Sequence, residues 1–228
     1  MHVPERRNAP GEHDGNPGKY VLRLQGAGVI PYGVTSIGQD AFGYAGLKSV
    51  SIPATVQTIA NYAFEARKDE GTIASLIFEK EADGSTALKT IGNVAFKYQC
   101  FPTVEIPKSV TSIGNNSFSY NQALISFTFE EGTLIKTFGT SLIANCPLIE
   151  TFTVPKTVTT LGNNDFENCI SLKSVIFEEG SKLTNVGSST FKASGIESIA
   201  FPDSVTTFTT VKSPNVNSSN ALFQNCVN

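Results

Sequence analysis

The stretch Val34-Thr35-Ser36-Ile37-Gly38-Gln39-Asp40-Ala41-Phe42 decides the fold, because the chain repeats it with variations. Degenerate copies occupy residues 56–64, 110–118, 158–166 and 183–191. Their last position belongs to a column of mostly aromatic residues: Phe42, Phe64, Phe96, Phe118, Ile143, Phe166, Phe191 and Phe223. A fixed motif that returns along a whole chain indicates a repeat architecture.

Other columns accompany the aromatic one. A small residue stands four positions earlier in most coils: Gly38, Ala60, Gly92, Gly114, Gly139, Gly162 and Gly187. After each aromatic residue a Leu-x-x-Val-x-Ile pattern follows, as in residues 47–52, and its period of two indicates a half-buried strand. A unit of about 22–25 residues with one short strand cannot bury its own apolar face, so it must stack on its neighbours. We therefore expect a solenoid of about eight coils over residues 28–226.

The residue that follows each strand predicts a longer period. It reads Pro31, Pro53, Glu79, Pro107, Glu130, Pro155, Glu178 and Pro202. Proline and glutamate alternate from the second coil onward, so the true repeating unit is predicted to be a pair of coils. Proline suits a position where the chain leaves the ladder and needs no N–H group.

The segments Asn164–Cys169 and 108–114 closely resemble the BspA-like leucine-rich repeats, whose unit reads approximately L-x-x-V-x-I-P-x-x-V-x-x-I-G-x-x-A-F-x-x-C. The resemblance covers about residues 30–226. It implies a leucine-rich repeat solenoid of the α/β class, mostly β, with a parallel sheet on the concave side and short helical turns or strands on the convex side. It also implies a cell-surface or secreted protein of host-associated bacteria or protists. Adhesion to host matrix proteins is the family's best-known role, and the family has no shared catalytic site.

Composition predicts how the chain is divided. Residues 1–19 are polar and contain several prolines and glycines, so we expect a flexible lead-in without an export signal. Residues 20–228 are expected to form a single repeat domain, whose residues 20–24 alternate like a strand that caps the first coil. A formal net charge of −3 gives no broad basic field, so no nucleic-acid partner is expected. No apolar run approaches about 18 residues, so we expect no membrane span.

Residues for catalysis are scarce. Both histidines, His2 and His13, lie in the lead-in, so the repeat fold has no histidine for acid–base chemistry or zinc binding. We therefore expect no enzyme activity, no cofactor and no metal site. The acidic turns at Glu130 and Glu178 are expected to be solvated, with a calcium-binding edge as the weaker alternative.

The cysteines form a further column. Cys146, Cys169 and Cys226 each follow the aromatic column by three residues, and Cys100 follows it by four. Stacked neighbours such as Cys146 and Cys169 would lie within reach of a disulfide, so two interpretations remain open. One is a column of small buried thiols, which we favour, and the other is cross-linked coils.

The predicted binding surface is the exposed face of the strands. One column on that face contains Ser51, Ile77, Glu105, Thr128, Thr153, Ile176 and Ala200. Ile77 and Ile176 are unexpectedly apolar there, and either partner contact or β-propensity explains them. The third coil also carries two charged insertions, 65–71 and 79–84, which should flank the strand 75–78. Insertions in solenoids often mark the binding side, although they can also be merely tolerated.

We therefore predict a ligand site around the third coil. Its residues are Ile77, Glu105, Thr128, Thr153 and Ile176 from the strands, and Arg67, Lys68, Asp69, Glu81 and Asp83 from the insertions. The expected function is a non-enzymatic binding module for a protein or glycan ligand, host extracellular matrix included. The alternative is a structural or assembly subunit, a spacer that associates with copies of itself.

Overall fold

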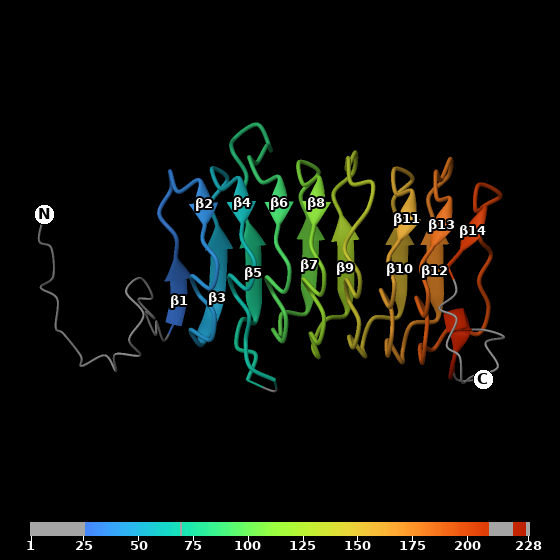
Figure 1. The fold of residues 1–228 in the computed structure, drawn as a ribbon. Helices are drawn as coiled ribbons and strands as arrows, with labels where there is room; N and C mark the ends of the chain where they lie inside the picture. The colour runs from blue at the N-terminus through green and yellow to red at the C-terminus, as the bar shows by residue number, and fades with distance from the viewer. Residues whose placement is uncertain (1–25, 69, 210–220, 227–228) are drawn as a thin grey trace, which may run out of the picture.

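The structure is a computed structural model, and it describes residues 26–68, 70–209 and 221–226. The predicted lead-in 1–19 and the predicted capping strand 20–24 lie outside these residues. The described chain winds into a stack of coils whose strands lie side by side along the molecule (Figure 1). The predicted leucine-rich repeat solenoid is confirmed, with about seven turns where eight were expected.

Most turns of the described chain contribute one longer strand and one strand of two residues; no short strand lies between β9 and β10, where Thr137 forms only an isolated bridge, and no longer strand lies between β13 and β14. The longer strands are β1 (Gly26–Val29), β3 (Leu47–Ile52), β5 (Ser75–Phe78), β7 (Thr103–Ile106), β9 (Ser126–Phe129), β10 (Thr151–Val154) and β12 (Ser174–Phe177). The short strands are β2 (Ser36–Ile37), β4 (Thr58–Ile59), β6 (Thr90–Ile91), β8 (Ser112–Ile113), β11 (Thr160–Leu161), β13 (Asn185–Val186) and β14 (Thr207–Phe208). All strand pairings in the described residues are parallel, and one short 3₁₀ helix, Ala221–Phe223, follows near the end.

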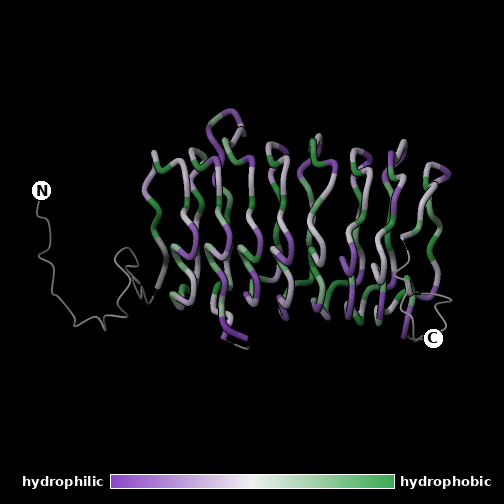
Figure 2. Tube along the Cα trace, in the orientation of Figure 1, coloured by the Kyte–Doolittle hydropathy of each residue, from purple (hydrophilic) through white to green (hydrophobic). Residues whose placement is uncertain are grey.

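The core is a row of stacked aromatic rings. The ring centroids of Phe42 and Phe64 lie 5.0 Å apart with an interplanar angle of 4°, and Phe64 stacks on Phe96 in the same way. Most of these rings are fully buried. Along every coil hydrophobic and hydrophilic residues alternate, so each coil adds one layer to a continuous interior (Figure 2).

The small residue before each aromatic position allows neighbouring coils to approach closely. A Cβ atom on Gly114 would lie 2.5 Å from the backbone nitrogen of Asn93, which no real side chain tolerates. The asparagine after the glycine then bonds to the next coil: the Oδ1 atom of Asn93 accepts a hydrogen bond from the N–H group of Asn115 at 2.7 Å. This asparagine ladder repeats in other coils and was not predicted from the sequence.

Three of the cysteines, Cys146, Cys169 and Cys226, belong to a column of internal donors. The thiol of Cys169 donates a hydrogen bond to the carbonyl of Ile143 in the preceding coil, as the amide of Asn121 does to the carbonyl of Phe96. All four cysteines are free thiols, so the column of thiols is confirmed and the cross-linked alternative is wrong. Cys146 and Cys169 are fully buried, and the other two are partly buried.

The predicted two-coil period has a clear structural form. The longer strands fall into the blocks β1-β3-β5, β7-β9 and β10-β12, so the ladder is interrupted after β5 and after β9. Each of the last two blocks joins a coil whose longer strand is followed by proline, a proline coil, to the next coil, whose longer strand is followed by glutamate, a glutamate coil. In both, the glutamate accepts the N–H group that follows the proline: Lys108 donates to Glu130 at 3.0 Å, and Lys156 to Glu178 at 2.9 Å.

One titratable group is buried within the stack. Asp165 occupies a column that holds alanine in the first three coils, and its carboxyl group is fully buried. It accepts hydrogen bonds from the N–H groups of Gly162 and Leu142. Burial nevertheless dominates and raises the pKa of Asp165 to about 7.

The substitution Phe118→Ala tests the aromatic column. The fully buried ring of Phe118 stacks on Phe96 at 5.3 Å and meets Phe127 edge-on at 5.1 Å. Removal of such a ring leaves a cavity, so the free energy of unfolding should fall by about 3–5 kcal/mol. Denaturant unfolding measures the change, and a loss below about 1 kcal/mol would contradict the packing described here.

The substitution Asp165→Asn tests the buried carboxyl group. The pKa of Asp165 is raised in the folded state. Its contribution to the free energy of unfolding is therefore fully present below pH about 4 and is lost as the pH rises through about 7. The free energy of unfolding of the natural chain, relative to that of Asp165→Asn, should therefore fall by about 3–4 kcal/mol between pH 4 and pH 8. Denaturant titrations at several pH values measure this difference, with Asp203→Asn at an exposed site as the control. Parallel pH profiles for the natural chain and Asp165→Asn would refute the shift.

Candidate functional site

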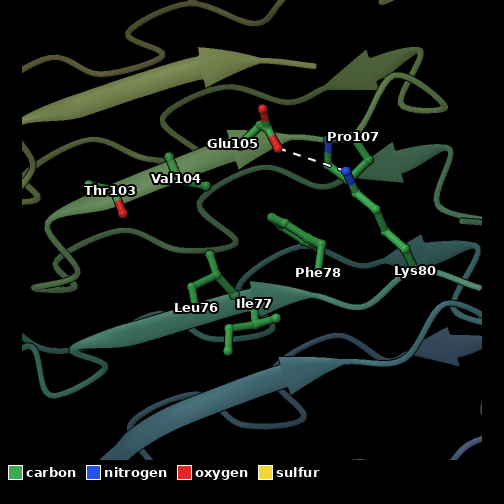
Figure 3. A pocket seen from close by; sticks show the side chains of 8 residues that line it. All are labelled: Leu76, Ile77, Phe78, Lys80, Thr103, Val104, Glu105 and Pro107. Carbon is green, nitrogen blue, oxygen red and sulfur yellow. Dashed lines mark ion pairs between the residues drawn. The ribbon is translucent and has the colours of Figure 1, made fainter. Parts of the chain in front are cut away.

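An open groove interrupts the exposed sheet between β5 and β7. No strand pairing joins these two strands in the part of the chain that the structure describes. The groove encloses about 230 Å³ (Figure 3). It is lined by Leu76, Ile77, Phe78, Lys80, Thr103, Val104, Glu105 and Pro107.

The last residue of β5 explains why the sheet opens here. Phe78 stands where the proline coils carry the smaller Ile52 and Ile106. Its ring lies between the two strands and packs edge-on against Phe96, with centroids 6.3 Å apart (Figure 3). Phe129 has the same position before the second interruption of the ladder. A ring of this size takes the space that close strand pairing would need.

Both ends of the groove are closed by specific contacts. Before the strands begin, the N–H group of Cys100 donates to the carbonyl of Ile73 at 3.2 Å, so the two coils are still bonded there. At the other end, the Nζ atom of Lys80 lies 3.8 Å from Glu105 and 3.1 Å from Glu130. These partly exposed ion pairs contribute little to stability, but they give the groove a charged rim.

The groove has an apolar floor and one exposed apolar wall. Leu76 and Phe78 are half buried, and Val104 is buried. The side chain of Ile77 is 54% exposed although it belongs to a strand of the core sheet. Such a depression, apolar at its centre and charged at its rim, has the anatomy of a protein-binding surface.

The structure gathers some of the predicted site residues and separates others. Ile77 and Glu105 line the groove together, and Thr128 lies beside Glu105 in the register of β7 and β9. Thr153 pairs with Ile176 in the separate block β10-β12. All five are exposed, so they share the solvent side of the longer strands.

The two charged insertions flank β5 as predicted, but at its opposite ends (Figure 1). Arg67 and Lys68 belong to the insertion before β5, and the guanidinium of Arg67 lies 5.7 Å from the ring centroid of Tyr44. Asp69 lies outside the described residues. Of the residues that the structure describes in the two insertions, only Lys80, after β5, lines the groove.

The acidic residues of the second insertion serve local contacts. Glu81 accepts a hydrogen bond from the hydroxyl of Tyr32 at 3.0 Å, which ties this insertion to the first coil. Asp83 accepts one from the N–H group of Ser85 at 2.9 Å, and hydrogen bonding to Ser85 lowers the pKa of Asp83. Neither carboxylate lines the groove.

Sequence reasoning missed Phe78, Lys80 and Val104. The sequence does contain a pattern that points to Phe78, because the strand of each glutamate coil ends in phenylalanine: Phe78, Phe129 and Phe177. The reach of Lys80 across the groove depends on the path of the insertion, and no local pattern encodes that path.

The described residues offer little for catalysis or metal binding. Within residues 26–68, 70–209 and 221–226, no three His, Cys, Asp or Glu side chains gather closely enough to hold a metal ion. Burial raises the pKa of Cys169 to about 12 and that of Cys146 well above its usual value, so neither thiol ionises readily. No helix in the same residues is long and apolar enough to cross a membrane.

Comparison with known proteins agrees with this architecture. The chain is similar to the pneumococcal vaccine antigen PcpA, with a TM-score of 0.62 and 22% identity over 84% of this chain and 58% of that structure. It is also similar to a leucine-rich repeat protein from Bacteroides ovatus, with a TM-score of 0.60 and 22% identity over 91% of this chain and 62% of that one. The chain thus spans about six tenths of each structure, and at this identity the likeness supports the fold alone. No curated protein sequence matches the chain.

A family model provides the remaining comparison. The model described as BspA type Leucine rich repeat region matches residues 27–79 and 89–228, in six copies. These residues make up most of the chain and include the whole groove between β5 and β7 apart from the insertion. The protein therefore belongs to the BspA type leucine-rich repeat family.

Proposed function

We propose that this solenoid is a non-enzymatic binding module at a cell surface, and that it holds a protein partner in the groove between β5 and β7. The exposed side chain of Ile77 above an apolar floor is the observation that carries the proposal. An apolar side chain of the partner would enter the groove and cover Ile77, and Lys80 and Glu105 would form the polar rim around it.

The repeat scaffold supports a binding role in a second way. Each coil presents its exposed residues at the spacing of the strands, so a partner meets a rigid and pre-formed surface. Leucine-rich repeat solenoids are typically scaffolds without catalytic residues, in line with the buried thiols and the scarcity of histidine. The similar fold of a pneumococcal vaccine antigen agrees with a surface location, and proteins of the host matrix are the partner class to test first.

Paired substitutions test this site. Ile77→Glu places a charge inside the groove, whereas Ile176→Glu places the same charge on an equally exposed residue, 50% against 54%, in the block β10-β12. Binding to a panel of immobilised matrix glycoproteins should weaken at least about tenfold with Ile77→Glu, because burial of an unpaired charge is costly. Ile176→Glu should bind like the natural chain.

Three other outcomes would reject the proposal in different ways. An equal loss of binding affinity in both variants would indicate that the site extends over the whole exposed face of the strands. Unchanged binding in both would move the site elsewhere on the molecule. Absence of binding together with a mass that rises with concentration would favour a self-associating structural subunit instead.

A further inference from the structure

The groove between β5 and β7 opens beside a concentration of negative charge. The parallel strands end at the same side of the stack (Figure 1), and charged residues gather there in β7 and in the turns that follow β5, β7 and β9. Residues 75–84, 103–108 and 126–132 contain six carboxylates: Glu79, Glu81, Asp83, Glu105, Glu130 and Glu131. We call these six carboxylates the acidic edge.

The charge of the whole chain is concentrated at this edge. The same three segments contain two cations, Lys80 and Lys108, and two positive against six negative charges give a net charge of −4. The full chain has a net charge of −3, so the rest of it is close to neutral. A field of one sign beside an otherwise neutral surface attracts a partner of the opposite sign.

The one lysine at the rim of the groove serves two carboxylates. The Nζ atom of Lys80 lies 3.8 Å from Glu105 and 3.1 Å from Glu130, so one positive charge faces two negative ones (Figure 3). The hydrogen bond from the N–H group of Lys108 is the main cause that lowers the pKa of Glu130, so this carboxylate stays ionised at neutral pH. The contact of Lys80 with Glu105 is the longer one, which leaves Glu105 accessible to a second cation.

Two other carboxylates of the acidic edge bond to neutral groups. Glu79 accepts a hydrogen bond from the hydroxyl of Ser51, and Glu81 accepts one from the hydroxyl of Tyr32. A hydroxyl donor orients a carboxylate without cancelling its charge. Both side chains are exposed, so the negative field extends from the rim of the groove into the solvent.

The size of the groove suits one side chain rather than an inserted strand. A strand between β5 and β7 would need about 4.8 Å on each side. The N–H group of Cys100 donates to the carbonyl of Ile73 at 3.2 Å just before these strands begin, which holds the two coils together at that end. The groove encloses about 230 Å³, less than the roughly 300–1,000 Å³ of small-molecule sites. A single apolar side chain therefore fits the groove best.

We propose that the partner of the groove is a basic protein segment, with an apolar side chain that enters the groove and an arginine beside it that binds the acidic edge. This inference rests on the binding role proposed above and adds the chemistry of the partner. The apolar side chain would cover Ile77 and pack against Phe78. The guanidinium would bind Glu105, because its planar donors form two parallel hydrogen bonds with a carboxylate, which a lysine does not match.

The test compares two double variants that remove the same charge. Glu105→Gln/Glu130→Gln removes two carboxylates from the acidic edge. Glu178→Gln/Glu179→Gln removes two from the turn after β12 and is the matched control, since Glu178 accepts the N–H group of Lys156 as Glu130 accepts that of Lys108. Glutamine keeps an acceptor oxygen, so both folds should be kept, and thermal unfolding verifies this. A third variant, Ile77→Ser, removes the apolar wall without adding a charge.

The probes are short fluorescent peptides of glycine and serine that carry Arg-Phe-Arg, Ser-Phe-Ser, Glu-Phe-Glu or Arg-Ala-Arg at their centre. Fluorescence anisotropy measures their dissociation constants at two salt concentrations. The Arg-Phe-Arg peptide should bind the natural chain and the control variant equally, and Glu105→Gln/Glu130→Gln at least about tenfold more weakly. The other three peptides should bind the natural chain at least about tenfold more weakly than Arg-Phe-Arg does, and added salt should weaken the binding of Arg-Phe-Arg.

Four results would overturn the basic partner. Equal or tighter binding of Ser-Phe-Ser or Glu-Phe-Glu, lost in Ile77→Ser, would keep the groove as a binding site and reject the basic partner alone. Equal binding of Arg-Ala-Arg would show attraction without an anchor in the groove. Equal losses in the two double variants would show attraction to the whole molecule. A lack of saturable binding of Arg-Phe-Arg would also reject the basic partner, whereas the binding role of the groove itself is judged separately by the matrix glycoproteins and Ile77→Glu.

Discussion

Stacking of equivalent residues from neighbouring coils is the interaction on which the rest of the molecule depends. Phenylalanine rings of successive coils lie 5.0–5.6 Å apart wherever the column is uninterrupted, and their burial excludes water from the axis of the stack. A glycine before several of the rings lets the backbones approach, and in some coils the asparagine after it bonds to the next coil. No coil could form this interior alone, so the stability of the fold depends on the contacts between neighbouring coils.

The pair of coils is the unit that shapes the surface. In the blocks β7-β9 and β10-β12, the glutamate of one coil accepts the backbone N–H group that follows the proline of the coil before it. A phenylalanine at the end of β5 and of β9 then stands where the ladder is interrupted. A phenylalanine thus ends the last strand before each interruption, so the break in the sheet between β5 and β7 follows the repeat pattern, whereas Lys80 at the rim of the groove comes from the insertion.

The parts that could be predicted from the sequence are those with a period. The columns of Phe118, Gly114 and Cys169, the parallel strands and the alternation of Pro107 with Glu130 all follow from spacing. The groove could be predicted only in part: Ile77 and Glu105 stand out on an exposed column, but Lys80 reaches them through an insertion whose path has no period.

Native-state hydrogen exchange of backbone amides would test the arrangement in coil pairs most directly. If the sheet is built from separate blocks, the amides of β7 that point toward β9 should be strongly protected. The amides of β7 that point toward β5 should exchange much faster, whereas the turn amides that bond across the same boundary, such as that of Phe96, should stay protected. Equal protection on both sides of β7 would show a continuous ladder and would contradict both the coil pair and the groove.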